Sequence, residues 1–406
     1  MTIFIKNVNL INGDDMTVIK FTNAKVYDNN NFLVKDLLFS FDDVLSDVVQ
    51  EIDATDYCVF PGLADVHVHF REPGFSYKET IYTGSRAGAK SGYTAVCTMP
   101  NLNPVPDNIE SVRIQRDIIQ RDAVIPVLPF GAITVNQGGK ILADLEGLAP
   151  YVCGFSDDGK GVDDEGLMYE CMQRAKTLNK VVSAHCEDGS QIKDSPQAEW
   201  KEIERDLILA DKTGCKYHVC HISTKESVQL IRDAKKSGVD VTCETAPHYL
   251  TLCNDDVIDD GRYKMNPPLR NIADKKALIQ GLIDGTIDMI ATDHAPHSKE
   301  EKNKGYVGSL NGIVGLETAF PIMYTNFVKN GIISIGKLIQ VMSYNPISRF
   351  NLPTDGVCVY DLTSQYVVNP ETFVSMGRSC PFAGNSVYGR CILTAIKNKT
   401  VYFNKI

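Results

Sequence analysis

Histidine and aspartate recur in this sequence at the ends of short apolar runs, where they could bind metal ions. The first case is the run that ends Val66-His67-Val68-His69. In a β-strand, alternate side chains lie on one face, so His67 and His69 would point the same way. Two neighbouring imidazoles at a strand end can bind one divalent cation. An H-x-H pair alone is a weak indication, and the other runs decide how it is interpreted.

Four further apolar runs end in the same residue types. Their endings are Ser156-Asp157-Asp158-Gly159, Ala184-His185-Cys186-Glu187-Asp188, Cys220-His221-Ile222-Ser223 and Thr292-Asp293-His294-Ala295-Pro296-His297. Six of the eight histidines lie at run ends, which disfavours the alternative that each is an ordinary hydrogen-bonded histidine. Imidazole and carboxylate ligands suit zinc or a similar ion. About six ligands are too many for one tetrahedral ion and suit two, which would share a carboxylate and supply a hydroxide nucleophile at neutral pH.

Short runs rich in Val, Ile and Tyr alternate with segments of helical spacing. The predicted strands cover residues 64–70, 93–99, 124–130, 151–156, 181–185, 217–221, 240–244 and 287–292. The predicted helices include residues 109–119, 165–178, 198–210, 224–236 and 275–282, and glycines that suit a left-handed cap follow helical runs at 92, 214, 238 and 285. Eight strand–helix units favour an α/β fold of the (β/α)8 TIM-barrel type over a doubly wound open sheet. The carboxyl ends of barrel strands share one rim, so the histidines and aspartates would meet there.

The two ends of the chain differ from its middle. Residues 1–60 contain short β-type runs with Asn/Asp turns, and residues 350–406 are again β-like without a convincing helix. We expect both ends to join in one small β domain, because chain termini often lie close together. The metal-dependent barrel would then occupy residues 61–349.

Composition restricts the partners of the protein. Lys plus Arg total 41 and Asp plus Glu total 51, so the formal charge is −10, which disfavours nucleic acid and anionic membranes as partners. No apolar run approaches the roughly 18 residues of a membrane helix, and the first residues lack the features of a signal peptide. The 12 cysteines include no C-x-x-C pair, which predicts reduced, buried thiols. We therefore expect a cytoplasmic protein that does not bind nucleic acid or membranes.

Several stretches together resemble the dihydroorotases, specifically the bacterial type in which an aspartate bridges two metal ions. The resemblance covers about residues 58–350. Its most specific parts are H-x-H-x-R-E-P-G at residues 67–74 and D-H-A-P-H at residues 293–297. The other parts are T-M-P-N at 98–101, D-D-G at 157–159, A-H-C-E-D at 184–188, H-V-C-H-I-S-T at 218–224, Y-K-M-N-P-P-L-R at 263–270 and G-I-V-G-L-E at 312–317.

The resemblance implies the reversible interconversion of N-carbamoyl-L-aspartate and (S)-dihydroorotate in pyrimidine (UMP) biosynthesis, with two zinc ions (Zn2+) per chain. One zinc would be held by His67, His69 and Asp293. The second would be held by His185 and His221, and Asp158 would bridge the two. Asp293 would also be the catalytic group that carries the proton from the hydroxide to the leaving nitrogen.

Two neighbours of Asp158 are alternatives for the bridge. Asp157 is the nearer one, and the sequence favours Asp158 over it. Other amidohydrolases use a carboxylated lysine, but Lys160 lies two residues further into the loop and is expected at the surface.

The predicted substrate contacts surround the metal ligands. An arginine can bind the carboxylate of dihydroorotate through two parallel hydrogen bonds, and Arg71 lies two residues past His69. Asn101 and Asn266 offer donors and acceptors, and His297 follows Asp293 by four residues. Leu310 and Asn311 stand where the family usually has Pro-Phe, in a loop whose backbone typically touches the pyrimidine ring.

Three further histidines have other expected roles. His218 lies three positions before His221, so strand alternation would turn it to the opposite face as a packed strand residue. His248 and His294 are candidates for hydrogen bonding to the metal ligands.

Two other functions are alternatives. An allantoinase or hydantoinase would share H-x-H but usually has the bridging lysine and no need for Arg71. A non-catalytic dihydroorotase-like scaffold for aspartate transcarbamoylase tends to lose metal ligands, whereas all the candidate positions are filled here. The resemblance leaves two protein partners open, namely a second copy in a homodimer and aspartate transcarbamoylase.

Overall fold

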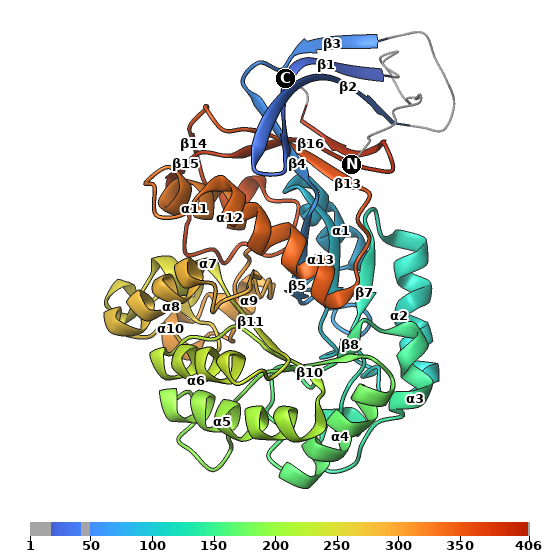
Figure 1. Cartoon of the computed structure of the whole chain (residues 1–406), viewed down its shortest axis with the longest axis vertical. Helices are drawn as coiled ribbons and strands as arrows, with labels where there is room; N and C mark the ends of the chain where they lie inside the picture. Colours follow the sequence, from blue (N-terminus) through green and yellow to red (C-terminus); the bar gives the residue numbers. More distant parts are fainter. Residues whose placement is uncertain (1–17, 42–48, 405–406) are drawn as a thin grey trace.

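The computed structural model describes residues 18–41 and 49–404, which form a mixed α/β fold (Figure 1). The middle of the chain contains parallel strands with helices outside them, and strands from both ends of the chain form a separate sheet at the top of the view. All 12 cysteines are buried and free, as predicted. No helix in the described ranges is long and apolar enough to cross a membrane.

Within the described residues, eight parallel strands occupy the middle of the chain. They are β5 (Leu63–Val68), β6 (Tyr93–Thr98), β7 (Val127–Pro129), β8 (Gly154–Phe155), β9 (Val181–Ala184), β10 (Lys216–Val219), β11 (Val241–Thr245) and β12 (Met289–Ile290). Each overlaps a predicted run, and β5, β10 and β11 extend one residue beyond theirs. They form two sheets, β5-β6-β7 and β12-β11-β10-β9-β8. Single parallel bridges, Gly131 to Phe155 and Val68 to His294, connect the two sheets at both edges.

The helices follow these strands along the chain. They are α1 (Ile81–Lys90), α2 (Ile109–Asp122), α3 (Leu145–Leu148), α4 (Glu165–Thr177), α5 (Pro196–Thr213), α6 (Lys225–Lys236), α7 (Pro247–Thr251), α8 (Ile272–Asp284), α9 (Lys299–Lys302), α10 (Gly305–Gly308), α11 (Ala319–Met323), α12 (Ile335–Ile339) and α13 (Asn345–Phe350). Local sequence fixes their ends. Thr224 caps α6 by accepting a hydrogen bond from the Ser227 N–H, and Gly214 ends α5 in the left-handed conformation.

Strands from both ends of the chain share one sheet. Its order is β2-β17-β16-β13-β4-β1-β3, and β14 pairs with β15 separately. The strands are β1 (Val18–Asp28), β2 (Asn31–Ser40), β3 (Val49–Asp53), β4 (Tyr57–Pro61), β13 (Gly356–Asp361), β14 (Tyr366–Val367), β15 (Ser386–Val387), β16 (Arg390–Ile396) and β17 (Lys399–Phe403). Asn29 and Asn30 have positive φ and form the tight turn of the β1–β2 hairpin, at the predicted Asn-rich turn.

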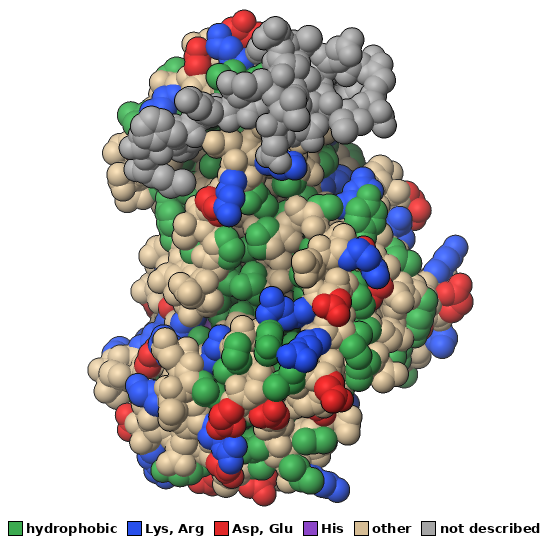
Figure 2. Space-filling view, turned by 90° about the vertical axis from the view of Figure 1, so that its right-hand side faces the viewer, with side chains coloured by type: hydrophobic (Ala, Val, Ile, Leu, Met, Phe, Trp, Pro, Cys, Tyr) green, Lys and Arg blue, Asp and Glu red, His purple; other side chains and the backbone are tan. Residues whose placement is uncertain are grey.

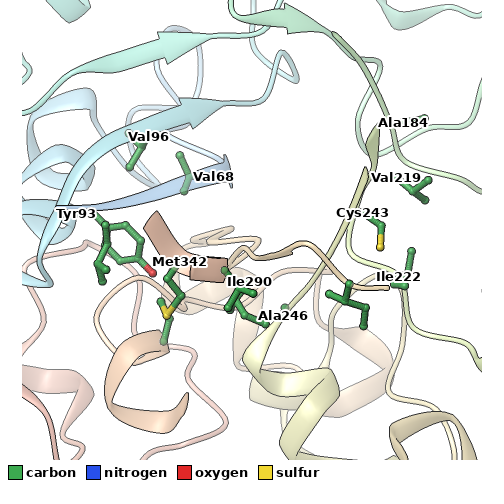
Figure 3. Close-up of a cluster of buried hydrophobic side chains, with 14 of the residues drawn as sticks. Val68, Tyr93, Val96, Ala184, Val219, Ile222, Cys243, Ala246, Ile290 and Met342 are labelled. Atoms are coloured by element: carbon green, nitrogen blue, oxygen red, sulfur yellow. The ribbon is translucent and has the colours of Figure 1, made fainter. Parts of the chain in front are cut away.

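Apolar side chains fill the space around the parallel strands and support the ends where the candidate ligands lie. Figure 3 shows Val68, Val96, Val219 and Ile290 from four of these strands, all of them buried. Positively and negatively charged side chains are interspersed on the face shown in Figure 2. The packed interior fixes the strand ends, and the site therefore has a rigid base.

Candidate metal centre

Each candidate ligand lies at or just beyond the carboxyl end of a parallel strand. His67 belongs to β5 and His69 follows it, Asp158 follows β8, and His185, His221 and Asp293 follow β9, β10 and β12. The bridge between Val68 and His294 places the end of β5 beside Asp293. All six side chains are nine-tenths or more buried. The structure therefore brings all six predicted ligands to one place.

The first group of ligands consists of His67, His69 and Asp293. The Nε2 atom of His69 lies 2.9 Å from Oδ1 of Asp293, and Nε2 of His67 lies 3.6 Å from the same oxygen. One ligand atom from each residue lies within 4.8 Å of the others. This is the set that the sequence assigns to one ion.

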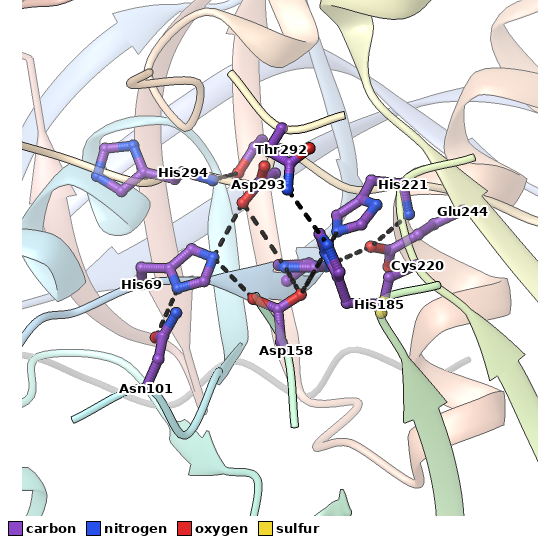
Figure 4. A network of polar contacts seen from close by, with 12 residues as sticks. His69, Asn101, Asp158, His185, Cys220, His221, Glu244, Thr292, Asp293 and His294 are labelled. Carbon is purple, nitrogen blue, oxygen red and sulfur yellow. Dashed lines mark hydrogen bonds and ion pairs between the residues drawn. The ribbon is translucent and has the colours of Figure 1, made fainter. Parts of the chain in front are cut away.

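The second group consists of His185 and His221, and Asp158 connects the two groups (Figure 4). The Nδ1 atom of His185 lies 2.9 Å from Nε2 of His221. The Oδ1 atom of Asp158 lies 3.2 Å from Nε2 of His67, 3.4 Å from Nε2 of His221 and 3.6 Å from Nδ1 of His185. Its Oδ2 atom lies 3.4 Å from Nε2 of His69. The two oxygens of Asp158 thus face both groups.

Asp157 points into the loop that follows β7. Its Oδ1 atom accepts hydrogen bonds from the N–H groups of Ile133 and Thr134, at 2.8 and 3.1 Å, and its Oδ2 accepts from the Thr134 hydroxyl. Lys160 donates to the carbonyl of Gln137 at 3.0 Å and is exposed. Within the described chain, Asp158 is the one of these three that contacts the clustered histidines.

Two of the candidate ligands have an unusual backbone conformation. The φ angle is 30° at His221 and 47° at Asp293, a region that side chains other than glycine seldom occupy. Such conformations cost about 1–3 kcal/mol and are common where a binding site needs a side chain aimed in a set direction. Both residues turn out of their strands at these positions.

The polar atoms of the cluster are suited to a divalent cation. His67 Nε2, Asp158 Oδ1 and His221 Nδ1 are buried and make no hydrogen bond with the residues that the structure describes. Buried polar atoms without partners are uncommon in folded proteins, and a cation bound between them would satisfy them. Burial would raise the pKa of Asp158, but His67 and the other imidazoles hold it well below its usual range, so the carboxylate is charged and ready to bind a cation. The residues present therefore fit a metal site.

A cavity of about 220 Å³ opens over this cluster. Its lining includes five predicted substrate contacts, namely Arg71, Asn101, Asn266, His297 and Asn311. Leu310 is not among the lining residues, and its side chain is 45% exposed. Lys193, which the sequence did not single out, also lines the cavity from the loop before α5.

Arg71 is a buried cation with no carboxylate partner among the described residues. Its Nε donates to the carbonyl of Pro296 at 3.3 Å, and its Nη2 lies 3.4 Å from Nε2 of His297. Burial lowers the pKa of Arg71, which shows that the surroundings disfavour its charge. A buried guanidinium without an ion pair is costly unless an anionic ligand binds it.

The two predicted asparagine contacts also hold histidines of the cluster. The Oδ1 atom of Asn101 lies 2.8 Å from Nδ1 of His69. The Nδ2 group of Asn266 lies 3.3 Å from Nε2 of His185 and 3.4 Å from Oε2 of Glu187. Each amide therefore orients a candidate ligand and has its other end left for a molecule in the cavity.

Comparison with known proteins identifies the family. A family profile described as Dihydro-orotase-like matches residues 57–202. A dihydroorotase of Fusobacterium nucleatum is 44% identical over 417 aligned positions, covering 94% of this chain and 98% of the relative. The chain belongs to the dihydroorotase family. A dihydroorotase of Staphylococcus epidermidis is 46% identical over 381 positions, covering 87% and 90% of the two chains.

Solved structures share the fold of this dihydroorotase-family chain. The L-hydantoinase of Arthrobacter aurescens has a TM-score of 0.81 at 24% identity and covers 94% of this chain and 95% of its own. The dihydropyrimidinase of Brevibacillus agri has a TM-score of 0.81 at 22% identity and covers 95% of each chain. At these identities the likeness shows the fold alone.

Glu244, at the end of β11, is a further residue of the site in this dihydroorotase-family chain that was not predicted from the sequence. The Oε1 atom of Glu244 lies 2.6 Å from Nδ1 of His67 and accepts from the N–H of His221 at 3.3 Å. Its Oε2 atom lies 3.0 Å from Nε2 of His218, a buried strand histidine. A signal was available, because the predicted run 240–244 also ends in an acidic residue.

Proposed function

We propose that this protein is a zinc-dependent dihydroorotase that interconverts N-carbamoyl-L-aspartate and (S)-dihydroorotate in pyrimidine biosynthesis. Relatives of 44–46% identity are named dihydroorotase. The observation that carries the substrate assignment is the place of Arg71 in the wall of the cavity over the ligand cluster, where its buried guanidinium has no ion-pair partner among the described residues. A cyclic amide that also bears a carboxylate fits such a cavity. Its carboxylate can bind Arg71 while its amide faces the ligand cluster.

We propose that the eight parallel strands form a closed (β/α)8 barrel. The bridges at Gly131–Phe155 and Val68–His294 support this, because they join the two parallel sheets at both edges. The sheet of strands from both chain ends would form a small β domain of residues 1–60 and 350–406, beside a barrel of residues 61–349.

We propose that the cluster binds two zinc ions. His67, His69 and Asp293 would hold one, His185 and His221 would hold the other, and Asp158 would bridge them, as its two oxygens face both groups. When bound, the ions would lower the pKa of a water molecule and polarise the amide carbonyl of the ring.

Asp293 is the proposed acid–base group. Its Oδ1 atom faces His67 and His69, and no described residue hydrogen-bonds its Oδ2 atom. In ring opening the carboxylate takes the proton of the attacking water and gives it to the leaving nitrogen. In ring closure it removes the proton from the carbamoyl nitrogen, which bonds to the side-chain carboxyl carbon, and it gives the proton to the oxygen that departs as water. Such proton transfer contributes about 10²–10⁴ in rate.

Arg71 would bind the substrate carboxylate, and Asn101, Asn266 and His297 would contact the rest of the molecule. His297 is neutral near pH 7, because burial together with Arg71 and Lys78 lowers its pKa to about 4. A neutral His297 donates its Nε2–H to the carbonyl of Asn311 at 2.8 Å and adds no positive charge beside Arg71. The guanidinium is therefore the anion-binding group on this side.

The cytoplasm is the proposed location, since the 12 free, buried cysteines suit a reducing compartment. The homodimer and the association with aspartate transcarbamoylase stay predictions. Size-exclusion chromatography of the chain with and without a transcarbamoylase subunit tests both.

The decisive test combines a zinc count with a hydrolysis assay of the isolated chain on dihydroorotate, hydantoin and allantoin. We expect bound zinc and a clear preference for dihydroorotate. The Arg71→Leu variant should lose about 10–100-fold in kcat/KM for dihydroorotate, because a charge-assisted hydrogen-bond pair is lost. Arg86→Gln is the matched control. Arg86 is exposed, and its hydrogen bond and cation–π contact among the described residues are both with Tyr82, so activity should be unchanged.

Three outcomes would contradict the proposal. Preference for hydantoin or allantoin would assign another cyclic amidohydrolase. A chain without metal and without turnover would be a scaffold. Wild-type kinetics of Arg71→Leu would remove the basis for the carboxylate assignment.

A further inference from the structure

The side-chain amide of Asn311 lines the cavity without a hydrogen-bond partner. Its Oδ1 atom is buried and unpaired, and none of the described residues accepts a hydrogen bond from its Nδ2 group. A buried amide oxygen without a donor is uncommon, because losing its hydrogen bond to water costs about 1–3 kcal/mol. The group has a donor and an acceptor available for a ligand.

The other two asparagines of the cavity differ from Asn311 in this respect. Asn101 holds His69, and Asn266 lies against His185, so both amides have a partner in the ligand cluster. Asn311 is farther along the chain, in the loop between α10 and α11, and its side chain contacts no candidate ligand. It is the one lining asparagine of the described chain whose amide is wholly unused.

The backbone at Asn311 is held firmly although its side chain is not. The carbonyl of Asn311 accepts from His297 Nε2 at 2.8 Å, and the Gly312 N–H donates to the carbonyl of Lys264 at 3.0 Å. Buried Lys302 donates to the carbonyls of Leu310 and Lys264, at 2.6 and 3.0 Å. The loop therefore holds the Cα of Asn311 at a fixed place in the cavity wall, while the amide can turn about χ2.

We propose that the Asn311 amide determines specificity by hydrogen-bonding the ureido edge of dihydroorotate. The Oδ1 atom accepts from ring N1–H, and the Nδ2 group donates to the C2 carbonyl, in the paired arrangement that two amides form. The inference rests on the proposed function, with the carboxylate at Arg71 and the scissile C4–N3 bond at the cluster.

The position of Asn311 supports this choice of atoms. The backbone carbonyl of Asn311 accepts a hydrogen bond from His297, which lies beside Arg71. Asn311 is therefore on the side of the cavity where Arg71 would bind the substrate carboxylate. In dihydroorotate the N1–H is adjacent to the carbon that bears the carboxylate, and C2 follows N1 around the ring. The ureido edge therefore lies between the group that Arg71 binds and the bond that is cleaved.

The test removes the amide and one of its partners separately. Asn311→Leu keeps the branched shape and the number of side-chain heavy atoms and removes both hydrogen bonds. The ligand counterpart is 2,6-dioxopiperidine-4-carboxylate, in which CH2 replaces N1–H, measured as a competitive inhibitor. Asn303→Leu is the matched control, because Asn303 is exposed at the end of α9. Zinc content and circular dichroism of each variant establish that the fold and the cluster are intact.

We expect Asn311→Leu to raise KM for dihydroorotate about tenfold with kcat within about twofold, the loss expected for such hydrogen bonds. The inhibition constant of the analogue should rise less than about threefold, since it lacks one of the two partners. Asn303→Leu should match the wild type in both measurements.

Two results would overturn this inference while the proposed function stands. One is an active wild type with an unchanged KM in Asn311→Leu, and the other is an equal loss for substrate and analogue. A wild type that does not act on dihydroorotate would overturn the proposed function and this inference with it. If Asn311→Leu does not fold, Asn311→Ala is measured in the same way, with the same two results decisive.

Discussion

Glu244 offers a test of whether the six ligands act as one metal centre. Its carboxylate lies 2.6 Å from Nδ1 of His67 and 3.0 Å from Nε2 of His218, and it is fully buried. A carboxylate bonded to the outer nitrogen of a ligating histidine fixes the tautomer of the ring and makes the inner nitrogen a better ligand. In Glu244→Gln one carboxylate oxygen is replaced by an NH2 group. This donor would face an imidazole N–H, so one of the two hydrogen bonds would be lost.

The expected magnitude follows from these contacts. Loss of such a supporting carboxylate weakens metal binding about 10–100-fold. At about 1.4 kcal/mol per decade this is about 1.4–2.8 kcal/mol. The metal-free protein should lose about 3–5 kcal/mol of stability as well, because a buried charge pair is broken. Chelator competition measures the zinc affinity, and urea denaturation of metal-free protein measures the stability.

Asp206→Asn is the control for the general loss of a buried carboxylate. Asp206 is also fully buried and accepts from the Tyr217 hydroxyl at 2.8 Å, but it contacts no candidate ligand. We expect it to lower stability and leave zinc affinity unchanged. Wild-type zinc affinity in Glu244→Gln would refute the reasoning, because it would show that the metal does not depend on the His67 ring that Glu244 orients.

Three further predictions concern the same site. Asp293→Ala should lower kcat in both directions by at least about 10²–10⁴, measured by absorbance of dihydroorotate, and wild-type turnover would exclude Asp293 as the acid–base group. Asp158→Ala should lose zinc, whereas Asp157→Asn should keep it and melt at a lower temperature, as metal analysis and thermal denaturation would report. His297 has a folded pKa of about 4 against 6.5 in the unfolded chain, so only the unfolded chain binds a proton between these values and stability rises with pH across that range. His297→Gln should flatten this rise in urea denaturation at pH 5 and pH 7, and an unchanged slope would contradict the burial argument.

The parallel strands could be predicted from the sequence because buried strands appear as short runs of β-branched residues. Their lengths could not. The run 287–292 contains only β12 (Met289–Ile290), and the run 151–156 contains only β8 (Gly154–Phe155). In both cases the backbone leaves the strand before the candidate metal ligands, because those residues need other φ angles or loop positions.

The sheet formed by strands from both chain ends shows a different limit of prediction from sequence. Its β-type character could be predicted from local composition, and so could the Asn-rich hairpin turn. Its strand order, in which β13 lies between β4 and β16, depends on contacts between residues about 300 positions apart. Nothing in the local pattern of either strand specifies such a neighbour.

The choice between Asp157 and Asp158 also depended on the three-dimensional structure. Both carboxylates are buried in adjacent positions, and the sequence favours Asp158 as the bridge but leaves Asp157 as an alternative. The loop after β7 decides between them, since the N–H groups of Ile133 and Thr134 bind Asp157 and leave Asp158 to face the histidines. A remote backbone segment thus selects which of the two carboxylates faces the histidines.

Strand alternation led to an incomplete interpretation of His218. Three positions separate it from His221, so alternation placed the two on opposite faces. However, β10 ends at Val219, and His221 has a φ of 30°, so the strand period does not extend to it. His218 remains inside the strand and reaches Glu244, the same carboxylate that contacts His67. Strand alternation predicts the direction of a side chain only while the backbone stays in the strand. It stops applying at candidate ligands beyond the strand ends, because the turn that follows aims their side chains.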